Sequence, residues 1–209
     1  MWIRLYQGNR DRQSKIFKHL RRKGIVRPRE LSSLGVRQEA LWRLHKQGKV
    51  ERLGRGVYGL PDRRITEQHS LAEAAKKVPN GVVCLLSALR FHNLTTQSPF
   101  ELWMALDRKA WLPKPGPGLK FRFYRFSGKA LTAGVEQHLV DGVPVRVYGV
   151  AKTVADCFKY RNKIGLDVAL EALREASRER KATSEEIHRY ARICRVENVM
   201  RPYMEALAA

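Results

Sequence analysis

The sequence predicts an α+β protein, in which a small helical module ending in a hairpin precedes a mixed α/β domain. Three observations support this class. Residues 39–58 read as an amphipathic helix, a glycine stop and a basic hairpin. Apolar and basic residues alternate over 119–126, as in a half-exposed strand. The last third of the chain has the apolar spacing of consecutive helices.

The N-terminal module contains three predicted helices. Apolar residues at helical spacing place the first over 12–23, and Pro28 suits the first turn of a second helix over 29–34. The third begins at 36–38 and ends before Gly48. Helix, short helix, glycine turn and helix is the order of a helix-turn-helix.

A basic hairpin follows the third helix and predicts a wing. Two alternating segments, 50–53 and 57–60, flank the glycine-rich turn 54–56. We therefore expect a winged helix-turn-helix DNA-binding domain over 1–62. The polar stretch 61–66 would link it to a second domain over 63–209.

The outer face of the third helix has the chemistry that reads base edges. Leu41 and Leu44 form its inward seam and leave basic and amide side chains outside. The wing adds arginines within reach of phosphates or a minor groove. The expected DNA-binding residues are Arg37, Gln38, Trp42, Arg43, Lys46, Arg52 and Arg55. A solvated polar face is the alternative interpretation.

The net charge of +21 and a pI of about 10.5 indicate a polyanionic partner. Residues 1–62 carry 16 Lys and Arg against 5 Asp and Glu, or +11, and residues 63–209 carry 25 against 15, or +10. The positive charge is therefore densest in the first module, but it continues beyond it. Ribosome-like basicity is the alternative.

Cysteine usage and hydropathy favour a cytoplasmic protein that does not contact a membrane. Cys84, Cys157 and Cys194 are far apart and form no zinc-type pair. The longest apolar run, 82–86, is too short to span a bilayer, and no signal-peptide pattern follows the first residues.

In the second domain we expect a small, mostly antiparallel sheet and C-terminal helices. Asp141-Gly142 between two apolar segments is a strong hairpin signal. Thr183 and Glu186 predict a capping box. The helices are expected over 151–160, 166–178, 184–194 and 197–207.

A few polar residues of the second domain lie in apolar surroundings. Lys152 and Asp156 would share one helix face at i, i+4, either as a local ion pair or as a phosphate-contacting site at a helix start. The candidate functional positions are Ser87, His92, Thr95, Lys152, Thr153 and Asp156.

No catalytic residue, metal site or cofactor is expected. The carboxylates are scattered, and no nucleophile elbow, Walker loop or kinase motif is present. A nuclease-like protein stays open as an alternative. So does an RNA-binding protein, because aromatic residues interleave with basic ones over 120–125.

Three segments resemble the AbiEi-type proteins, which are antitoxins and transcriptional regulators of type IV toxin–antitoxin systems. The first is the wing end Gly54-Arg-Gly-Val-Tyr-Gly-Leu-Pro61. The second is Cys84-Leu-Leu-Ser-Ala-Leu-Arg-Phe-His-Asn-Leu-Thr-Thr-Gln97. The third combines Val143-Pro-Val-Arg-Val with Ala151–Phe158 and continues through Gly165. The latter two are the more specific, because basic hairpins occur in many winged helices.

The resemblance implies a winged helix domain that binds inverted repeats of double-stranded DNA upstream of its own operon and represses it. It also implies a C-terminal antitoxin domain with a basic surface, acting in phage defence. The paired toxin would be a nucleotidyltransferase-like protein, countered without a stable toxin–antitoxin complex.

Overall fold

The computed structural model describes residues 2–33, 35–54, 56–61, 67–113 and 118–208. The chain divides into two compact units. The first unit comprises Met1–Pro79, Pro113–Leu119 and Leu139–Val145, and the second comprises Asn80–Leu112, Lys120–His138 and Arg146–Ala209.

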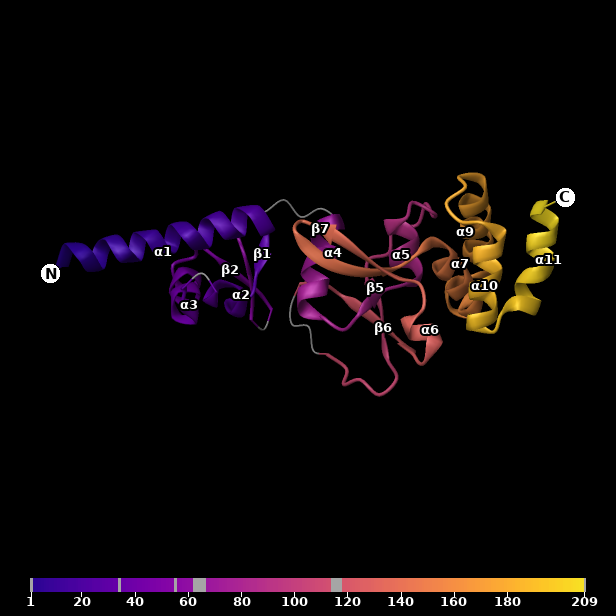
Figure 1. Cartoon of the computed structure of the whole chain (residues 1–209), viewed down its shortest axis with the longest axis horizontal. Coiled ribbons are helices and arrows are strands. Elements are labelled where there is room, and N and C mark those ends of the chain that lie inside the picture. Colours follow the sequence, from indigo (N-terminus) through magenta and orange to yellow (C-terminus); the bar gives the residue numbers. More distant parts are fainter. Residues whose placement is uncertain (1, 34, 55, 62–66, 114–117, 209) are drawn as a thin grey trace. The chain divides into compact units, whose positions relative to one another are not determined.

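The first unit is built from helices and a small sheet (Figure 1). Its elements are α1 (Trp2–Lys23), β1 (Ile25–Val26), α2 (Pro28–Ser32), α3 (Gln38–Lys46), β2 (Glu51–Gly54), β3 (Val57–Gly59) and α4 (Glu67–Lys77). The predicted order of three helices and a hairpin is therefore present. Helix α1 starts earlier than the predicted residue 12. The helical spacing of apolar residues that predicted the helix begins only at Ile16, but no proline among the preceding residues stops the helix from extending further.

The strands of the first unit form an antiparallel sheet in the order β1-β3-β2. Arg52 lies opposite Tyr58, and the register shifts between Arg52 and Gly54, as at a β-bulge. The core beneath this sheet is apolar and collects residues from α1, α2, α3 and the strands. Its members include Ile16, Leu20, Val26, Leu31, Val36, Leu41, Leu44 and Val50.

Helix α3 ends where the sequence predicts, and the stop positions β2. Gly48 has φ +67°, a conformation that glycine adopts at little cost, and Lys49 N donates to Leu44 O at 3.0 Å. The His45 ring nitrogen Nδ1 lies 3.1 Å from Val50 O. The turn and this contact fix the hairpin to the end of the helix.

The five-stranded sheet has the order β6-β5-β4-β8-β7. Its strands are β4 (Val82–Val83), β5 (Leu102–Asp107), β6 (Phe121–Phe126), β7 (Val135–Val140) and β8 (Val143–Tyr148). The Asp141-Gly142 turn joins β7 to β8 as predicted, with φ values of +48° and +70°.

The expectation of a mostly antiparallel sheet needs correction. β4 pairs antiparallel with β5, but β4 with β8 and β5 with β6 are parallel pairs. A parallel pair requires a crossover of about a dozen residues or more, and both connections are long enough for one. The sheet is therefore mixed. Pairing between segments that are separated in the chain leaves no local sequence signal, so it was not predicted.

Strand β6 also presents its side chains differently from the predicted pattern. Phe126 is buried and Tyr124 packs against the core of the second unit. Phe121 and Phe123 are half-buried and lie on the other face, with ring centroids 5.6 Å apart. β6 is an edge strand, and Phe121, Phe123 and Tyr124 are only partly covered, whereas Phe126 is buried.

Four helices of the second unit follow the predicted boundaries closely. They are α7 (Val150–Lys159), α9 (Leu166–Arg178), α10 (Ser184–Cys194) and α11 (Glu197–Ala208). The unit also contains α5 (Leu85–Phe91) and two short helices that were not predicted, α6 (Lys129–Thr132) and α8 (Arg161–Ile164). The capping box of Thr183 and Glu186 is present at the start of α10. Helices α7, α9 and α10 lie side by side, with α11 next to α10 (Figure 1).

The predicted boundary after residue 62 stays a prediction, because residues 62–66 lie outside the described part of the chain. Helix α4 belongs to the first unit, where Lys76 forms an ion pair with Glu30 of α2. The His69 ring nitrogen Nδ1 lies 3.2 Å from Asp141 Oδ2, also within this unit.

Candidate nucleic-acid interface

Helix α3 and its N-cap present the predicted residues to solvent. Leu41 and Leu44 are buried, as the sequence predicts, while Arg37, Gln38 and Arg43 are exposed. Arg37 is the N-cap residue, and no side-chain hydrogen bond caps the helix there. The backbone N–H groups of the first turn therefore receive no hydrogen bond from the Arg37 side chain. The positive end of the helix dipole lies at this same end of α3 and favours an anion there.

Trp42 adds an aromatic ring to the exposed residues of α3. It is 55% exposed, which is unusual for so large an apolar side chain. The Lys46 ammonium lies 5.6 Å from the centre of the Trp42 ring, one helical turn further on. Two predicted residues thus form one exposed cationic and aromatic patch.

The wing contributes Arg52, which is exposed on β2. Its Nε donates to Gly54 O at 3.3 Å, and this bond directs the side chain towards the hairpin turn. Arg55, the predicted tip residue, lies outside the described residues. Glu39 and Glu51 are exposed as well, so the surface is predominantly rather than uniformly basic.

Two candidate positions of the second unit meet at one backbone carbonyl. His92 Nε2 donates to Tyr148 O at 2.8 Å, and Thr153 Oγ1 donates to the same oxygen at 3.0 Å. Burial lowers the pKa of His92, and the hydrogen bond to Tyr148 opposes that shift. Both side chains hold the end of β8 against α5 and α7.

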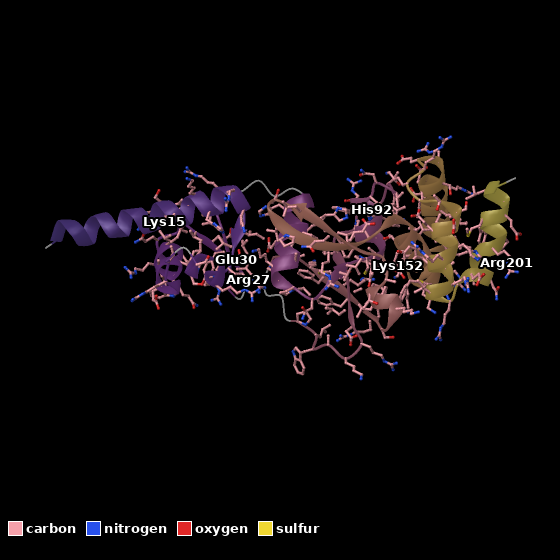
Figure 2. All side chains as sticks on the ribbon, in the orientation of Figure 1. Lys15, Arg27, Glu30, His92, Lys152 and Arg201 are labelled. Atoms are coloured by element: carbon pink, nitrogen blue, oxygen red, sulfur yellow. The ribbon has the colours of Figure 1, made fainter. Side chains whose placement is uncertain are left out.

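Lys152 and Asp156 form the predicted pair along α7, with Nζ 2.5 Å from Oδ2. Lys152 is 0% exposed and Asp156 2%. Figure 2 labels Lys152 within the second unit. The Lys152 ammonium also lies 4.1 Å from the centre of the Tyr148 ring. Cys194 Sγ donates to Asp156 Oδ1 at 3.2 Å. Burial raises the pKa of Asp156 and Lys152 opposes the rise. The Lys152 ammonium is closed to solvent.

Ser87 and Thr95 bind elsewhere in the second unit. Ser87 Oγ accepts a hydrogen bond from Trp103 N at 2.9 Å and fixes α5 to β5. Thr95 Oγ1 donates to Glu171 Oε2 at 3.1 Å. The six candidate positions are therefore not one site, because only His92 with Thr153 and Lys152 with Asp156 come together.

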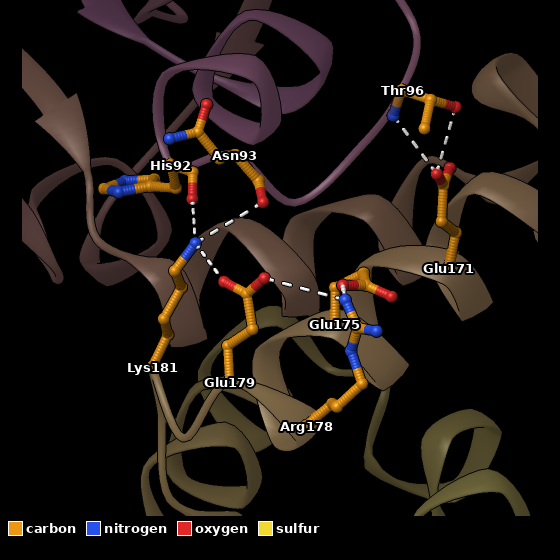
Figure 3. Close-up of polar contacts among 8 residues, drawn as sticks. All are labelled: His92, Asn93, Thr96, Glu171, Glu175, Arg178, Glu179 and Lys181. Atoms are coloured by element: carbon orange, nitrogen blue, oxygen red, sulfur yellow. Dashed lines mark hydrogen bonds and ion pairs between the residues drawn. The ribbon is translucent and has the colours of Figure 1, made fainter.

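Glu171 on α9 and Lys181 just after it bind the segment that follows α5 (Figure 3). Neither residue was predicted from the sequence. Glu171 accepts from Thr96 N and Thr96 Oγ1 at 3.1 and 3.3 Å. Lys181 Nζ donates to His92 O at 2.6 Å. These partners are about 75 to 89 residues apart along the chain, so no local pattern marks them.

Three negative findings apply to the described residues. No three His, Cys, Asp or Glu side chains gather there as possible metal ligands. No helix among them has the length and apolar character needed to cross a membrane. The three cysteines are buried and not disulfide-bonded.

The segment that contains α3 matches a known protein family. Residues 14–61 match the family model of the AbiEi antitoxin transcriptional regulators. The match spans β1, α2, α3, β2 and β3, together with the C-terminal part of α1 from residue 14 onward. It bears out the resemblance for the AbiEi segment, as we call residues 14–61. The resemblance of the two later segments stays a prediction. No curated protein matches the chain.

Proposed function

We propose that the AbiEi segment is a winged helix-turn-helix that binds double-stranded DNA, with α3 in the major groove and the β2–β3 hairpin as the wing. The observation that carries this proposal is the exposure of Arg37, Gln38 and Arg43 at the start of α3 and along it, directly before the β2–β3 hairpin in the chain. An arginine fork suits guanine and a glutamine amide suits adenine. The family match to transcriptional regulators supports it.

The preferred sequence is proposed to be an inverted repeat upstream of the protein's own operon, so that binding represses transcription. The regulator would also be the antitoxin of a type IV pair. It would counter a nucleotidyltransferase-like toxin without a stable complex. The basic second unit would supply the antitoxin activity, in a protein that acts in the cytoplasm and needs no cofactor or membrane.

A gel shift at two salt concentrations tests the DNA-binding part. The upstream DNA of the gene is compared with random DNA of equal length. We expect tighter binding to the upstream DNA, and binding to both should weaken strongly with salt because phosphate contacts release counterions. Equal affinity for the two DNAs would contradict sequence-specific repression and favour an RNA-binding or nuclease-like role.

Gln38 and Gln47 make a matched pair for locating the contact. Both are exposed glutamines at opposite ends of α3. Gln38→Ala should lower the preference for the upstream DNA by about 1–3 kcal/mol if its amide reads a base. Gln47→Ala should leave the preference unchanged. If both variants keep the wild-type preference, α3 does not read the bases through its first turn.

A further inference from the structure

The second unit contains a pocket of about 550 Å³ whose rim is basic. It lies where the end of β6, the start of α6, the end of α7 and the end of α10 converge. Its volume is within the usual range for small-molecule sites, roughly 300–1,000 Å³. The lining residues that matter for its chemistry are Arg125, Lys129, Lys159, Arg195, Asp156 and Tyr160.

Four cationic side chains line the pocket against one carboxylate. Lys129, Lys159 and Arg195 are exposed. Arg125 is fixed, because its Nη1 donates to Asp107 O at 2.8 Å and to Ala110 O at 2.7 Å. A guanidinium carries five N–H donors, so Arg125 keeps further donors beyond these two contacts. The rim therefore attracts an anion.

The interior has different chemistry from the rim. Asp156 is 2% exposed, and its oxygens accept from Lys152 and Cys194 while the residue still lines the pocket. A carboxylate has about four acceptor positions, so capacity for further donors remains. Asp156 would repel a phosphate placed against it but would accept hydrogen bonds from hydroxyl or amino groups. The rim of the pocket thus suits an anion, whereas its interior suits hydrogen-bond donors.

An aromatic wall borders the same space. The rings of Tyr160 and Phe126 are stacked, with centroids 5.5 Å apart and planes 5° apart. The Tyr160 hydroxyl is neutral at physiological pH and adds no negative charge to the pocket, and burial raises its pKa further, to about 12. Flat apolar walls with a few polar groups are typical of ligand sites.

We propose that this pocket binds a small phosphorylated molecule bearing hydroxyl or amino groups, such as a nucleotide or a sugar phosphate. The phosphate lies among Lys129, Lys159 and Arg195, and the donor groups point towards Asp156. This site is separate from the proposed DNA contacts on α3, and its test does not depend on them.

Arg195 and Arg180 have similar settings, so they serve as test and control in the experiment. Each is an exposed arginine just after the end of a helix, with φ +58° and +51° respectively. Glycine is favoured in that conformation, so Arg195→Gly and Arg180→Gly each remove one charge without straining the fold. Of these two arginines, Arg195 lines the pocket and Arg180 does not.

Calorimetric titration of the full chain with ATP, AMP, glucose 6-phosphate and pyrophosphate tests the proposal at physiological salt. We expect at least one of the three donor-bearing ligands to bind more tightly than pyrophosphate. Arg195→Gly should weaken that binding about tenfold, as expected for loss of one charge-assisted contact, and Arg180→Gly should not. Lys159→Gln should weaken it as well.

Three results would overturn the proposal. The first is no binding of any probe at millimolar concentration. The second is an equal loss in the two arginine variants, which would indicate diffuse attraction of polyanions. The third is pyrophosphate binding as tightly as the best donor-bearing ligand, which would remove the role given to Asp156. The gel shift of the Proposed function is unaffected by any of these outcomes.

Discussion

The polar residues of α3 and those of α7 look alike in the sequence but differ in the structure. On α3, Arg37, Gln38 and Arg43 are exposed. On α7, Lys152, Thr153 and Asp156 are buried and bonded to one another or to β8. Both helices are amphipathic segments with polar residues among apolar ones.

The difference shows what a polar residue at a given helix position contributes. A charge left in water costs little and stays available for a partner, whereas a buried charge needs its partner within the fold. We therefore propose that the α3 residues serve binding and that the α7 pair mainly stabilises the fold, while Asp156 also borders the pocket. The following variants test that assignment, beginning with the largest expected effect.

Lys152→Ala should destabilise the protein most. It leaves Asp156 buried without its cation, and loss of one member of a buried pair typically costs about 3–5 kcal/mol. Chemical denaturation followed by circular dichroism measures the change. The double variant Lys152→Met with Asp156→Leu should recover most of the loss, because it removes both charges. A wild-type free energy of unfolding for Lys152→Ala alone would contradict a structural role.

Gly134→Ala should have the next largest effect. Gly134 has φ +71°, and an added Cβ would lie 2.7 Å from Lys152 Cβ. Strain and overpacking together should cost about 2–4 kcal/mol of stability. Gly48 has φ +67° with nothing within 4 Å of an added Cβ, so Gly48→Ala should cost only about 1 kcal/mol. If thermal unfolding shows equal losses of stability in the two variants, the positive φ alone accounts for the cost, and the contact with Lys152 adds nothing.

These two glycines also show how far local sequence reasoning extends. Gly48 was identifiable as a helix stop because it follows a periodic apolar segment. The close approach of Gly134 to α7 depends on tertiary packing and leaves no local signal. The longer C-terminal helices α7, α9, α10 and α11 were predictable from their period, but the four-residue helices α6 and α8 and the parallel pairs β4–β8 and β5–β6 were not. Strand partners distant in sequence are chosen by packing.

Arg52→Ala should affect DNA binding rather than stability. If Arg52 contacts a phosphate, its loss should weaken binding to all DNA sequences similarly and reduce the slope of log affinity against log salt by about 0.9. Arg174→Ala removes an exposed arginine of the second unit and is the control. Filter binding over a salt series measures both slopes. The same decrease in both variants would remove any special role of the wing.

His92→Gln should have the smallest effect, and only on pH dependence. Burial lowers the pKa of His92, so between its ordinary and lowered pKa the unfolded chain binds more protons than the folded one. His92 therefore stabilises the fold above its ordinary pKa, and this contribution is lost as pH falls through the lowered value. Glu136, His138 and Lys181 also influence this group.

The measurement is the free energy of unfolding between about pH 7 and pH 5, the range that brackets the ordinary pKa of histidine. Its decline with falling pH should be shallower in His92→Gln than in the wild type, and glutamine can still donate to Tyr148 O. An unchanged decline in His92→Gln would mean that other groups cause it.

The candidate interface was more predictable than the interior network. Exposure of α3 follows from periodicity, since Leu41 and Leu44 determine which side is buried. The roles of Glu171 and Lys181 were not predictable, because each binds a segment far away in the chain. The pairing of Lys152 with Asp156 was predictable from their spacing, whereas its complete burial depends on β8 and α10.

The two-residue strand β4 has a consequence for how the protein is made. β4 lies at the centre of the sheet, where Val83 pairs with Val147 on one side and with Met104 on the other. During synthesis, the sheet cannot close until residue 147 has left the ribosome. The first unit also includes residues 139–145. A nascent chain stalled before β8 would therefore expose incomplete cores in both units, and chaperone contacts should be concentrated in that interval.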